Sequence, residues 1–468
     1  MIVSLAIVVS AAQLEPAPTA RQPPMGWRSW NLFELNVDQS LLEQQIQGLI
    51  RRRHEIEGKP TSLLDLGYDS IGLDDGWQNC GAGVDGTFHD AQGRPMVNLT
   101  RFPDLGALVA TGHSKGVRMG WYANNCWCNE GGDPKRAHYQ QDADATVAFG
   151  FDAIKVDSCG PAKNISAWRA ALDGASAALT GRHVELENCR NYPYTAHLTA
   201  HSSCPAELFR STEDNAPDFL SIMGNLVTNA RAPGSDGDVH GGLPVSHPGC
   251  WSYPDMLEIV GSGTCRQDLK PGTCGADDPA RRAGGLNANE SRAHFGAWCI
   301  VSSPLVLGHD LADDAQYDAA WPIISNRAAI EVNQAWAGGD PGRLVAQSAP
   351  AEALTNLSLY HGAGCECVWA GQTLPRWNAW AKRLDAAGTE AAALAINLGD
   401  EPLQAGSIVL DAHDILGTIE ARNKTMQLRN VYDIWANRSL SLGATSSWIV
   451  PELAPRSSMF VKVKFEAL

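Results

Sequence analysis

The amino-acid sequence predicts an α/β fold, a (β/α)8 TIM barrel followed by a C-terminal antiparallel β-sandwich domain. Over the first two thirds of the chain, short apolar segments that end in polar residues alternate with helical segments about every 30–50 residues. This alternation is typical of parallel strands joined by crossover helices. Beyond about residue 342 the pattern becomes an alternation of apolar and polar residues, which favours antiparallel strands. We therefore place the barrel at residues 25–342 and the β-sandwich at 343–468.

Eight barrel strands can be placed from apolar runs and the turn residues that follow them. In order they are expected within residues 25–31, 68–77, 116–123, 153–156, 183–187, 208–211, 245–250 and 299–307. Helical spacing of apolar residues predicts helices at 40–54, 104–114 and 139–149. No Gly-x-Gly-x-x-Gly follows a strand, which argues against a dinucleotide-binding fold. In the last domain, strands are expected around 392–396, 407–410, 431–435 and 459–465.

Charge and composition restrict the partners. The chain has 468 residues, with 36 basic and 52 acidic side chains and a net charge of −16. Binding to nucleic acid or to an anionic membrane requires basic surface, so neither is an expected partner. After the N-terminus, no apolar run approaches the length of a membrane span.

The N-terminus predicts export. Residues 1–12 have an apolar core that ends in Ser10-Ala11-Ala12, and we interpret them as a signal peptide. The even count of 12 cysteines fits an oxidising compartment, and six Asn-x-Ser/Thr sequons predict a glycoprotein. The expected location is secreted or in the lysosomal or vacuolar lumen. The sequons begin at Asn98, Asn164, Asn289, Asn356, Asn423 and Asn437.

The stretch from Phe151 to Gly160 carries the strongest chemical signal. Lys155 and Asp157 point to the same face, because side chains of a strand alternate. They lie at the exit of a buried strand, where α/β barrels place their active sites. A structural ion pair is the alternative interpretation of these two residues.

Further acidic residues lie at other predicted strand ends and should converge on one face of the barrel. Lys155 and Arg210 are the cations that could compensate them. Paired carboxylates without a histidine cluster are the minimum equipment for glycoside hydrolysis, one ionised and the other protonated. No metal or other cofactor is implied, and Cys-x-Cys pairs are better read as disulfide partners. The acidic residues are Asp74, Asp75, Asp157, Asp214 and Asp255.

Taken in order, the motifs resemble the α-galactosidase and α-N-acetylgalactosaminidase family of retaining glycoside hydrolases. The resemblance runs from Met25 to about Asp310, with a similar C-terminal β-domain. The motifs that carry it are Pro24-Met25-Gly26-Trp27 with Trp30, Asp74-Asp75 with Trp77, Lys155-Val156-Asp157 with Cys159, Arg210-Ser211-Thr212-Glu213-Asp214, and Pro254-Asp255-Met256-Leu257.

This resemblance implies a role for each residue. Asp157 would be the nucleophile and Asp214 the general acid/base. Lys155 and Arg210 would keep Asp157 ionised and hold sugar hydroxyls. The remaining substrate-binding residues would be Asp74 and Asp75 at the 4- and 6-hydroxyls, Asp255 near the 2-hydroxyl, and Trp30 and Tyr122 as pocket walls. Helix capping by Asp74 or Asp255, and packing by Tyr122, are the alternatives.

Two features depart from the family. Where the family carries Cys-Glu-Trp or Cys-Ser-Trp to read the 2-substituent of the sugar, this chain has Arg190, which we include among the substrate-binding residues. A cysteine-containing insert at residues 250–274 has no counterpart that we can identify. Neighbouring loops suggest disulfides between Cys189 and Cys204, and between Cys159 and either Cys126 or Cys128.

The sequence therefore predicts a retaining exo-α-galactosidase that releases terminal α-galactose from oligosaccharides or glycoconjugates by double displacement. An α-N-acetylgalactosaminidase of the same family is the near alternative. A β-L-arabinopyranosidase is more remote, because the Asp74-Asp75 pair suits a 6-hydroxyl that arabinose lacks. A galactose-binding protein without turnover is the alternative from another class, and a homodimer is left open.

Overall fold

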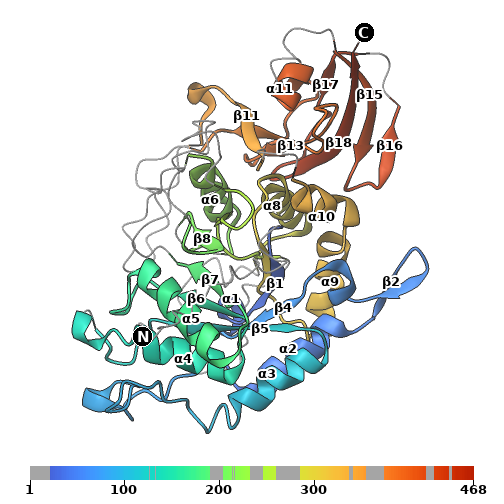
Figure 1. Cartoon of the computed structure of the whole chain (residues 1–468). Helices are drawn as coiled ribbons and strands as arrows, with labels where there is room; N and C mark the ends of the chain where they lie inside the picture. The colour runs from blue at the N-terminus through green and yellow to red at the C-terminus, as the bar shows by residue number, and fades with distance from the viewer. Residues whose placement is uncertain are drawn as a thin grey trace, which may run out of the picture.

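The computed structural model places a barrel and a β-sandwich side by side (Figure 1). It describes residues 22–125, 127–131, 133–189, 204–212, 214–215, 217–231, 246–259, 285–336, 341–354, 374–417, 426–441 and 445–467.

Eight parallel strands form the barrel, and its fold class is as predicted. Their spatial order is β10-β1-β4-β5-β6-β7-β8-β9. The ring closes where the amide of Leu257, just after β9, donates to the carbonyl of Val306 in β10 at 2.8 Å. The bounds are β1 Met25–Arg28, β4 Ser70–Gly72, β5 Arg118–Ala123, β6 Ala153–Val156, β7 Glu185–Asn188, β8 Leu208–Arg210, β9 Trp251–Tyr253 and β10 Leu305–Leu307.

Helices cover the barrel, and several begin at a side-chain cap. The carboxylates of Asp38 and Asp104 and the amide oxygen of Asn164 each accept a backbone N–H in the first turn of their helix. Asn287 and Glu290 form a capping box. The helices are α1 Trp30–Phe33, α2 Gln39–Ile50, α3 Leu105–Ser114, α4 Tyr139–Phe149, α5 Ile165–Leu179, α6 Phe219–Arg231, α8 Ala288–Ile300, α9 Asp314–Ile324 and α10 Arg327–Gln334.

Two predicted strands are displaced. The strand expected at 245–250 is β9, at Trp251–Tyr253. The strand expected at 299–307 is shorter, because residues 299 and 300 belong to α8 and only Leu305–Leu307 form β10. Helix α8 is buried on almost every side, so its apolar residues follow no amphipathic pattern. A fully buried helix end and a buried strand cannot be told apart by periodicity.

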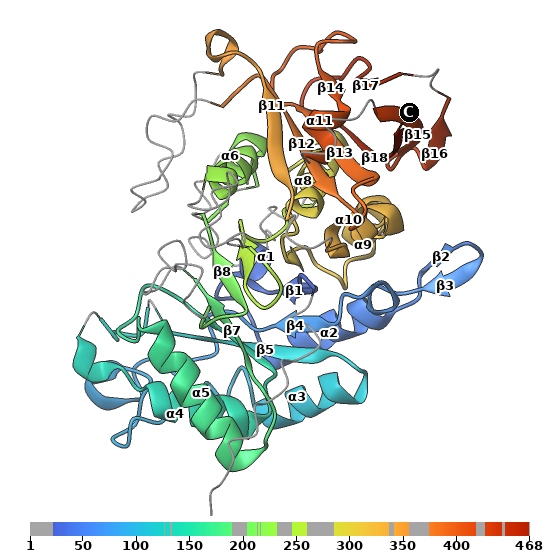
Figure 2. The same cartoon turned by 45° about the horizontal axis from the view of Figure 1, so that its top comes forward.

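The C-terminal part is a β-sandwich (Figure 2). A six-stranded antiparallel sheet has the order β11-β12-β13-β18-β15-β16, and β14 pairs with β17 in a second sheet. Alanine and larger apolar side chains form one core between the two sheets. The bounds are β11 Arg343–Gln347, β12 Trp377–Arg383, β13 Glu390–Asn397, β14 Val409–Asp411, α11 Ala412–Leu416, β15 Met426–Asp433, β16 Arg438–Leu440, β17 Ser447–Ile449 and β18 Ser458–Ala467.

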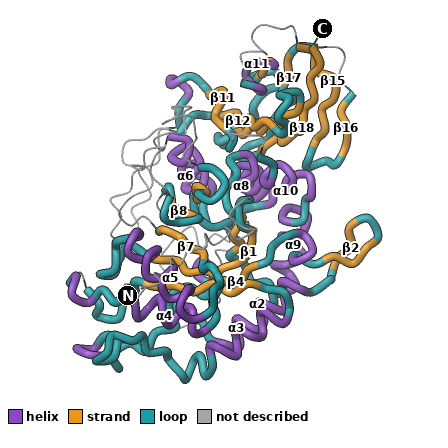
Figure 3. Tube along the Cα trace, in the orientation of Figure 1, coloured by secondary structure: helices purple, strands orange, loops and turns teal. Residues whose placement is uncertain are grey.

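The barrel and the sandwich contact each other through helices. Helix α8 packs against β13 and β18. The side-chain Nδ2 of Asn326, just before α10, donates to the carbonyl of Ile434 at 2.8 Å. A hairpin of β2 (His54–Ile56) and β3 (Lys59–Thr61) projects from the barrel (Figure 3). A search of the described residues finds no helix with the length and apolarity that crossing a bilayer requires.

Candidate functional site

The predicted site residues that the structure describes gather at the carboxyl ends of the barrel strands. Lys155 lies in β6, Tyr122 in β5 and Arg210 in β8, each within the last three residues of its strand. Parallel strands of a barrel converge at this edge, where enzymes with this fold carry their catalytic groups. The acidic residues follow directly: Asp74 and Asp75 after β4, Asp157 after β6, Asp214 after β8 and Asp255 after β9.

Lys155 and Asp74 form a buried ion pair. Lys155 Nζ lies 2.9 Å from Asp74 Oδ2, and the two side chains are 9% and 2% exposed. Burial is the largest single influence and lowers the pKa of Lys155, but Asp74, Cys189 and Asp157 together outweigh it, so the pKa of Lys155 is raised and the ammonium stays charged. Arg28 Nη1 lies 3.7 Å from the same carboxylate and Nη2 lies 2.5 Å from Glu187.

Asp157 is held by two donors. The hydroxyl of Tyr122 donates to Asp157 Oδ2 at 2.7 Å, and the amide of Ser158 donates to Oδ1 at 2.7 Å. Burial and the neighbouring Asp157 carboxylate raise the pKa of Tyr122 well above its ordinary value, so Tyr122 keeps its proton and remains a donor. Tyr122 is therefore more than a packing residue, because it contacts the predicted nucleophile directly.

Arg210 joins two of the acidic residues. Its Nη2 lies 2.9 Å from Asp214 Oδ1 and its Nη1 lies 3.0 Å from Asp255 Oδ1. The guanidinium is buried, whereas the Asp214 side chain is 68% exposed. Burial raises the pKa of Asp255, and the Arg210 cation opposes that rise. Asp214 is thus tethered by a fixed cation while its carboxyl remains open to solvent.

The thiol of Cys189 lies beside Arg210, the cation that also pairs with Asp214. It is buried after β7 and accepts a hydrogen bond from Arg210 Nη1 at 3.8 Å. Burial raises its pKa, and the carboxylates of Asp157 and Asp214 both raise it further, whereas Arg210 and Lys155 lower it. One thiol therefore lies within electrostatic range of both carboxylates and both cations.

Asp255 and Trp30 complete one wall of the site. Asp255 has a positive φ of 90°, a strained conformation for a residue other than glycine. The indole N–H of Trp298 donates to its carbonyl at 2.7 Å and the amide of Asn215 donates to its Oδ2 at 2.8 Å. Asp255 is not a helix cap here, because residues 256–259, which follow it directly, are not helical. Trp30 packs against Tyr253, Met256 and Val306.

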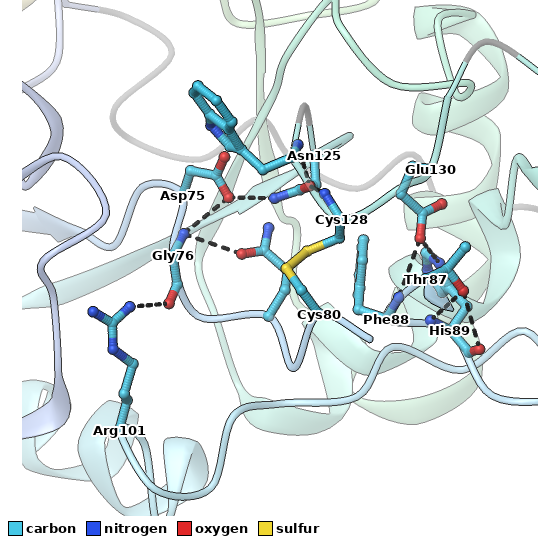
Figure 4. Close-up of a disulfide and its surroundings, with 12 residues drawn as sticks. Asp75, Gly76, Cys80, Thr87, Phe88, His89, Arg101, Asn125, Cys128 and Glu130 are labelled. Atoms are coloured by element: carbon cyan, nitrogen blue, oxygen red, sulfur yellow. Dashed lines mark hydrogen bonds and ion pairs between the residues drawn. A yellow bond between two sulfur atoms is a disulfide. The ribbon is translucent and has the colours of Figure 1, made fainter. Parts of the chain in front are cut away.

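The carboxylate of Asp75 is buried, and among the described residues only one of its two oxygens accepts hydrogen bonds (Figure 4). Its Oδ1 accepts hydrogen bonds from Asn125 Nδ2 at 2.6 Å and from the amide of Gly76 at 2.9 Å. Its Oδ2 is buried, and among the described residues it has no hydrogen-bond partner. Burial and the adjacent Asp74 raise the pKa of Asp75 to about 7. An unpaired carboxylate oxygen at this position is suited to a hydroxyl of a ligand.

Asn125 is a site residue that sequence analysis missed. While its Nδ2 donates to Asp75, its Oδ1 accepts the amides of Trp127 at 2.7 Å and Cys128 at 2.6 Å. A disulfide joins Cys128 to Cys80 and so fixes this loop beside Asp75 (Figure 4). Neither contact is visible in the sequence, because Asn125 and Asp75 are 50 positions apart.

Two of the disulfide predictions are corrected. Cys204 pairs with Cys250, and Cys189 is a free buried thiol, so the predicted Cys189–Cys204 bond is wrong. Cys128 pairs with Cys80, which rules out a Cys128–Cys159 bond. The connectivity of cysteines does not follow from their spacing in the sequence.

Several predicted features lie outside the described residues. Arg190 and Cys126 are among them, so the role of Arg190 and a Cys126–Cys159 bond stay predictions. Residues 260–284, which hold most of the cysteine-containing insert, also lie outside. Cys159 itself is disulfide-bonded.

The raised pKa of Asp75 gives a testable pH dependence. Its folded pKa of about 7 lies above the ordinary value of 3.8, so its protonation stabilises the fold fully below about pH 4, and this is lost as the pH rises through 7. Asp75→Asn removes the titration. We expect the stability of the variant relative to wild type to increase between pH 4.5 and 8, by up to about 4 kcal/mol.

Urea unfolding of both proteins at the two pH values measures this effect. Asp85→Asn, at an exposed position of the loop that follows Asp75, is the matched control and should show no such trend. A difference between Asp75→Asn and wild type that stays constant with pH would contradict the prediction.

Fold and site together define a class: a (β/α)8 barrel with a β-sandwich appendage and an acidic cluster at its strand ends. The family model described as alpha galactosidase A (Melibiase_2) matches residues 22–272, more than half of the chain. The chain therefore belongs to this family.

Known relatives and solved structures agree with the family. An alpha-galactosidase of Cyamopsis tetragonoloba is 28% identical over 318 residues, which cover 67% of this chain and 64% of the relative. The alpha-galactosidase of Saccharomyces cerevisiae with raffinose superposes with a TM-score of 0.67 at 18% identity, over 96% of this chain and 100% of that one. A β-L-arabinopyranosidase of Geobacillus stearothermophilus, in complex with arabinose, gives 0.66 at 19% identity, over 95% and 97%. The chain thus matches less than two thirds of the length of the Cyamopsis enzyme.

Proposed function

We propose that this protein is a retaining exo-α-galactosidase that hydrolyses terminal α-D-galactosyl residues. The observation that carries the proposal is the set of contacts at the carboxyl ends of the barrel strands, where Tyr122 donates to Asp157 and Arg210 pairs with both Asp214 and Asp255. The glycoside hydrolase interpretation fits two carboxyls in one site. The Cyamopsis relative is named an alpha-galactosidase, and one solved relative holds raffinose, which supports an α-galactoside as the substrate class.

In the proposed reaction Asp157 attacks the anomeric carbon while Asp214 protonates the leaving oxygen. The Tyr122 hydroxyl and the Ser158 amide hold the Asp157 carboxylate in place for this attack. Asp214 is exposed enough to meet the leaving group and then to take a proton from water. Retention requires the two carboxyls to be roughly 5–5.5 Å apart, which leaves no room for water between them.

Sugar recognition falls to the remaining residues. We infer that the unpaired Oδ2 of Asp75 accepts a hydroxyl of galactose, and that Asp74, oriented by Lys155, accepts another. We assign Asp255 and Trp30 to the same pocket, with Arg210 between Asp255 and Asp214. The choice between galactose and N-acetylgalactosamine depends on the position of Arg190.

The test is hydrolysis of p-nitrophenyl α-galactoside and of the α-N-acetylgalactosaminide. NMR identifies which anomer of the sugar is released first. We expect cleavage of the galactoside with release of α-galactose. Preference for the acetamido sugar would change the specificity and keep the mechanism. First release of β-galactose would contradict retention. Binding of galactose without turnover of either substrate would favour a galactose-binding protein.

Secretion, a homodimer and the domain limits given above remain predictions. Secretion can be tested by expressing the full chain in a eukaryotic host and sequencing the N-terminus of the protein recovered from the medium.

A further inference from the structure

A cavity lies away from the strand-end site, between the barrel and the β-sandwich. Its volume is about 1080 Å³, and it is bounded by the β2–β3 hairpin, α9, α10 and strands β13, β15 and β18. Figures 1 and 2 show these elements next to one another. The proposed reaction makes no use of this cavity.

The cavity wall combines aromatic surface with balanced charge. Trp321, Tyr432 and Trp435 supply aromatic rings. The lining cations are already paired, as in Lys462 with Glu331 at 2.6 Å. The same holds for Lys464 with Glu390 and for Arg327 with Glu57. Paired charges leave little net field for an ion, whereas ring faces beside polar groups suit the C–H and O–H groups of a neutral saccharide.

One lining group lacks a partner. The indole Nε1 of Trp435 is buried and, in the part of the chain that the structure describes, makes no hydrogen bond. Because this nitrogen has almost no solvent-accessible surface, a ligand in the cavity can reach only the ring surface of Trp435. The ring of Trp435 packs against Phe460, and the backbone amide of Trp435 donates to Asp433 Oδ1 at 3.0 Å.

A sequon opens onto the same cavity. Asn437 lines it and begins the sequence Asn437-Arg438-Ser439. Asn437 is exposed in the turn between β15 and β16, with a positive φ of 50°. The hydroxyl of Tyr432 donates to its Oδ1, which leaves Nδ2, the atom that a glycan takes, outside that bond. Trp435 precedes Asn437 by two residues, and both residues line the cavity.

We propose that Asn437 carries an N-linked glycan whose first sugars occupy this cavity, packed against Trp435 and Tyr432. The donor would be a lipid-linked N-acetylglucosamine oligosaccharide diphosphate, used by an oligosaccharyltransferase of the secretory pathway. Asn437 Nδ2 forms a bond to C1 of the sugar, the bond from C1 to the diphosphate oxygen breaks, and a base of the transferase takes the amide proton. The transfer involves no oxidation or reduction.

A tethered saccharide is a better occupant than a free one. A short covalent tether gives an effective concentration in the millimolar range, so even a weak contact between sugar and ring is populated. The other described sequons lack this arrangement: Asn164, for example, caps α5 on the far side of the barrel and does not line the cavity.

The experiment uses the full chain secreted from a eukaryotic host behind that host's own secretion signal. Mass spectrometry of glycopeptides measures occupancy at Asn437. An endoglycosidase then releases glycans from the native and from the heat-denatured protein. We expect Asn437 to be occupied, and its glycan to be released at least about 10-fold more slowly from the native protein. Asn437→Gln and the deglycosylated protein should each lose roughly 2–4 °C of Tm.

Two variants serve as controls. Trp435→Ala should keep occupancy but abolish the protection from release, whereas Ser439→Thr preserves the sequon and should behave as wild type. An unmodified Asn437 in the secreted protein would overturn the proposal. So would an occupied Asn437 whose glycan is released equally fast from native and denatured protein, because the sugar would then project into solvent.

Discussion

Asp157→Asn is expected to lower kcat/KM for p-nitrophenyl α-galactoside by roughly 10⁴-fold or more, with little change in stability. An amide has the size of the carboxylate; its oxygen can accept the Ser158 amide while its NH2 group donates to the Tyr122 oxygen, so the contacts that hold this side chain are largely retained. It cannot form the covalent glycosyl intermediate. The loss should therefore appear in kcat, while the affinity for galactose stays near that of wild type.

The role of Asp157 can be separated from that of Asp214. In Asp157→Gly, added azide can attack the sugar directly in one displacement and should restore turnover, with β-galactosyl azide as the product. In Asp214→Gly, azide should instead intercept the covalent intermediate and give the α-azide. Loss of proton transfer alone costs less, about 10²–10⁴-fold. Identical azide products from the two variants would exclude these assignments.

A matched control lies at the other end of the barrel. Asp69 precedes β4 and pairs with Arg118 at 3.1 Å. It therefore lies at the amino end of the strand, whereas the acidic cluster lies at the carboxyl end. Asp69→Asn also removes one carboxylate from a barrel ion pair, and we expect it to keep wild-type kcat/KM. A comparable loss in both variants would show that the effect of Asp157→Asn reflects a general disturbance of the barrel.

The sequence predicted those parts of the molecule that depend on local pattern. Strand β6 is apolar, short and followed by a turn, and its predicted bounds agree with the structure. The paired positions of Lys155 and Asp157 follow from strand alternation. By contrast, the α8 helix ends in buried apolar residues on all faces, so Cys299 and Ile300 were wrongly assigned to a strand.

Contacts between distant segments were the part that could not be predicted. Asn125 reaches Asp75 only because a loop crosses from one strand end to another and a disulfide holds it there. Arg28 and Glu187 approach each other from β1 and β7 across the barrel interior. Such pairs are determined by the closure of the barrel, and a single sequence contains no local pattern that reports them.

The second large effect concerns stability. Lys155→Met is expected to destabilise the protein by about 3–5 kcal/mol, because it leaves the buried Asp74 carboxylate without its closest cation. Arg28 remains near the same oxygen, but at 3.7 Å and already engaged with Glu187, so it compensates only in part. Unfolding in urea, followed by tryptophan fluorescence, measures the change.

Two further variants test whether the unpaired buried charge causes the loss of stability in Lys155→Met. Lys464→Met breaks an ion pair with Glu390 whose side chains are 53% and 46% exposed, and because solvent screens this pair we expect little change in stability. Lys155→Met combined with Asp74→Asn removes both charges, so it should be more stable than Lys155→Met alone. If the double variant is the less stable of the two, the loss arises from packing of the lysine stem, and the ion pair contributes little to the fold.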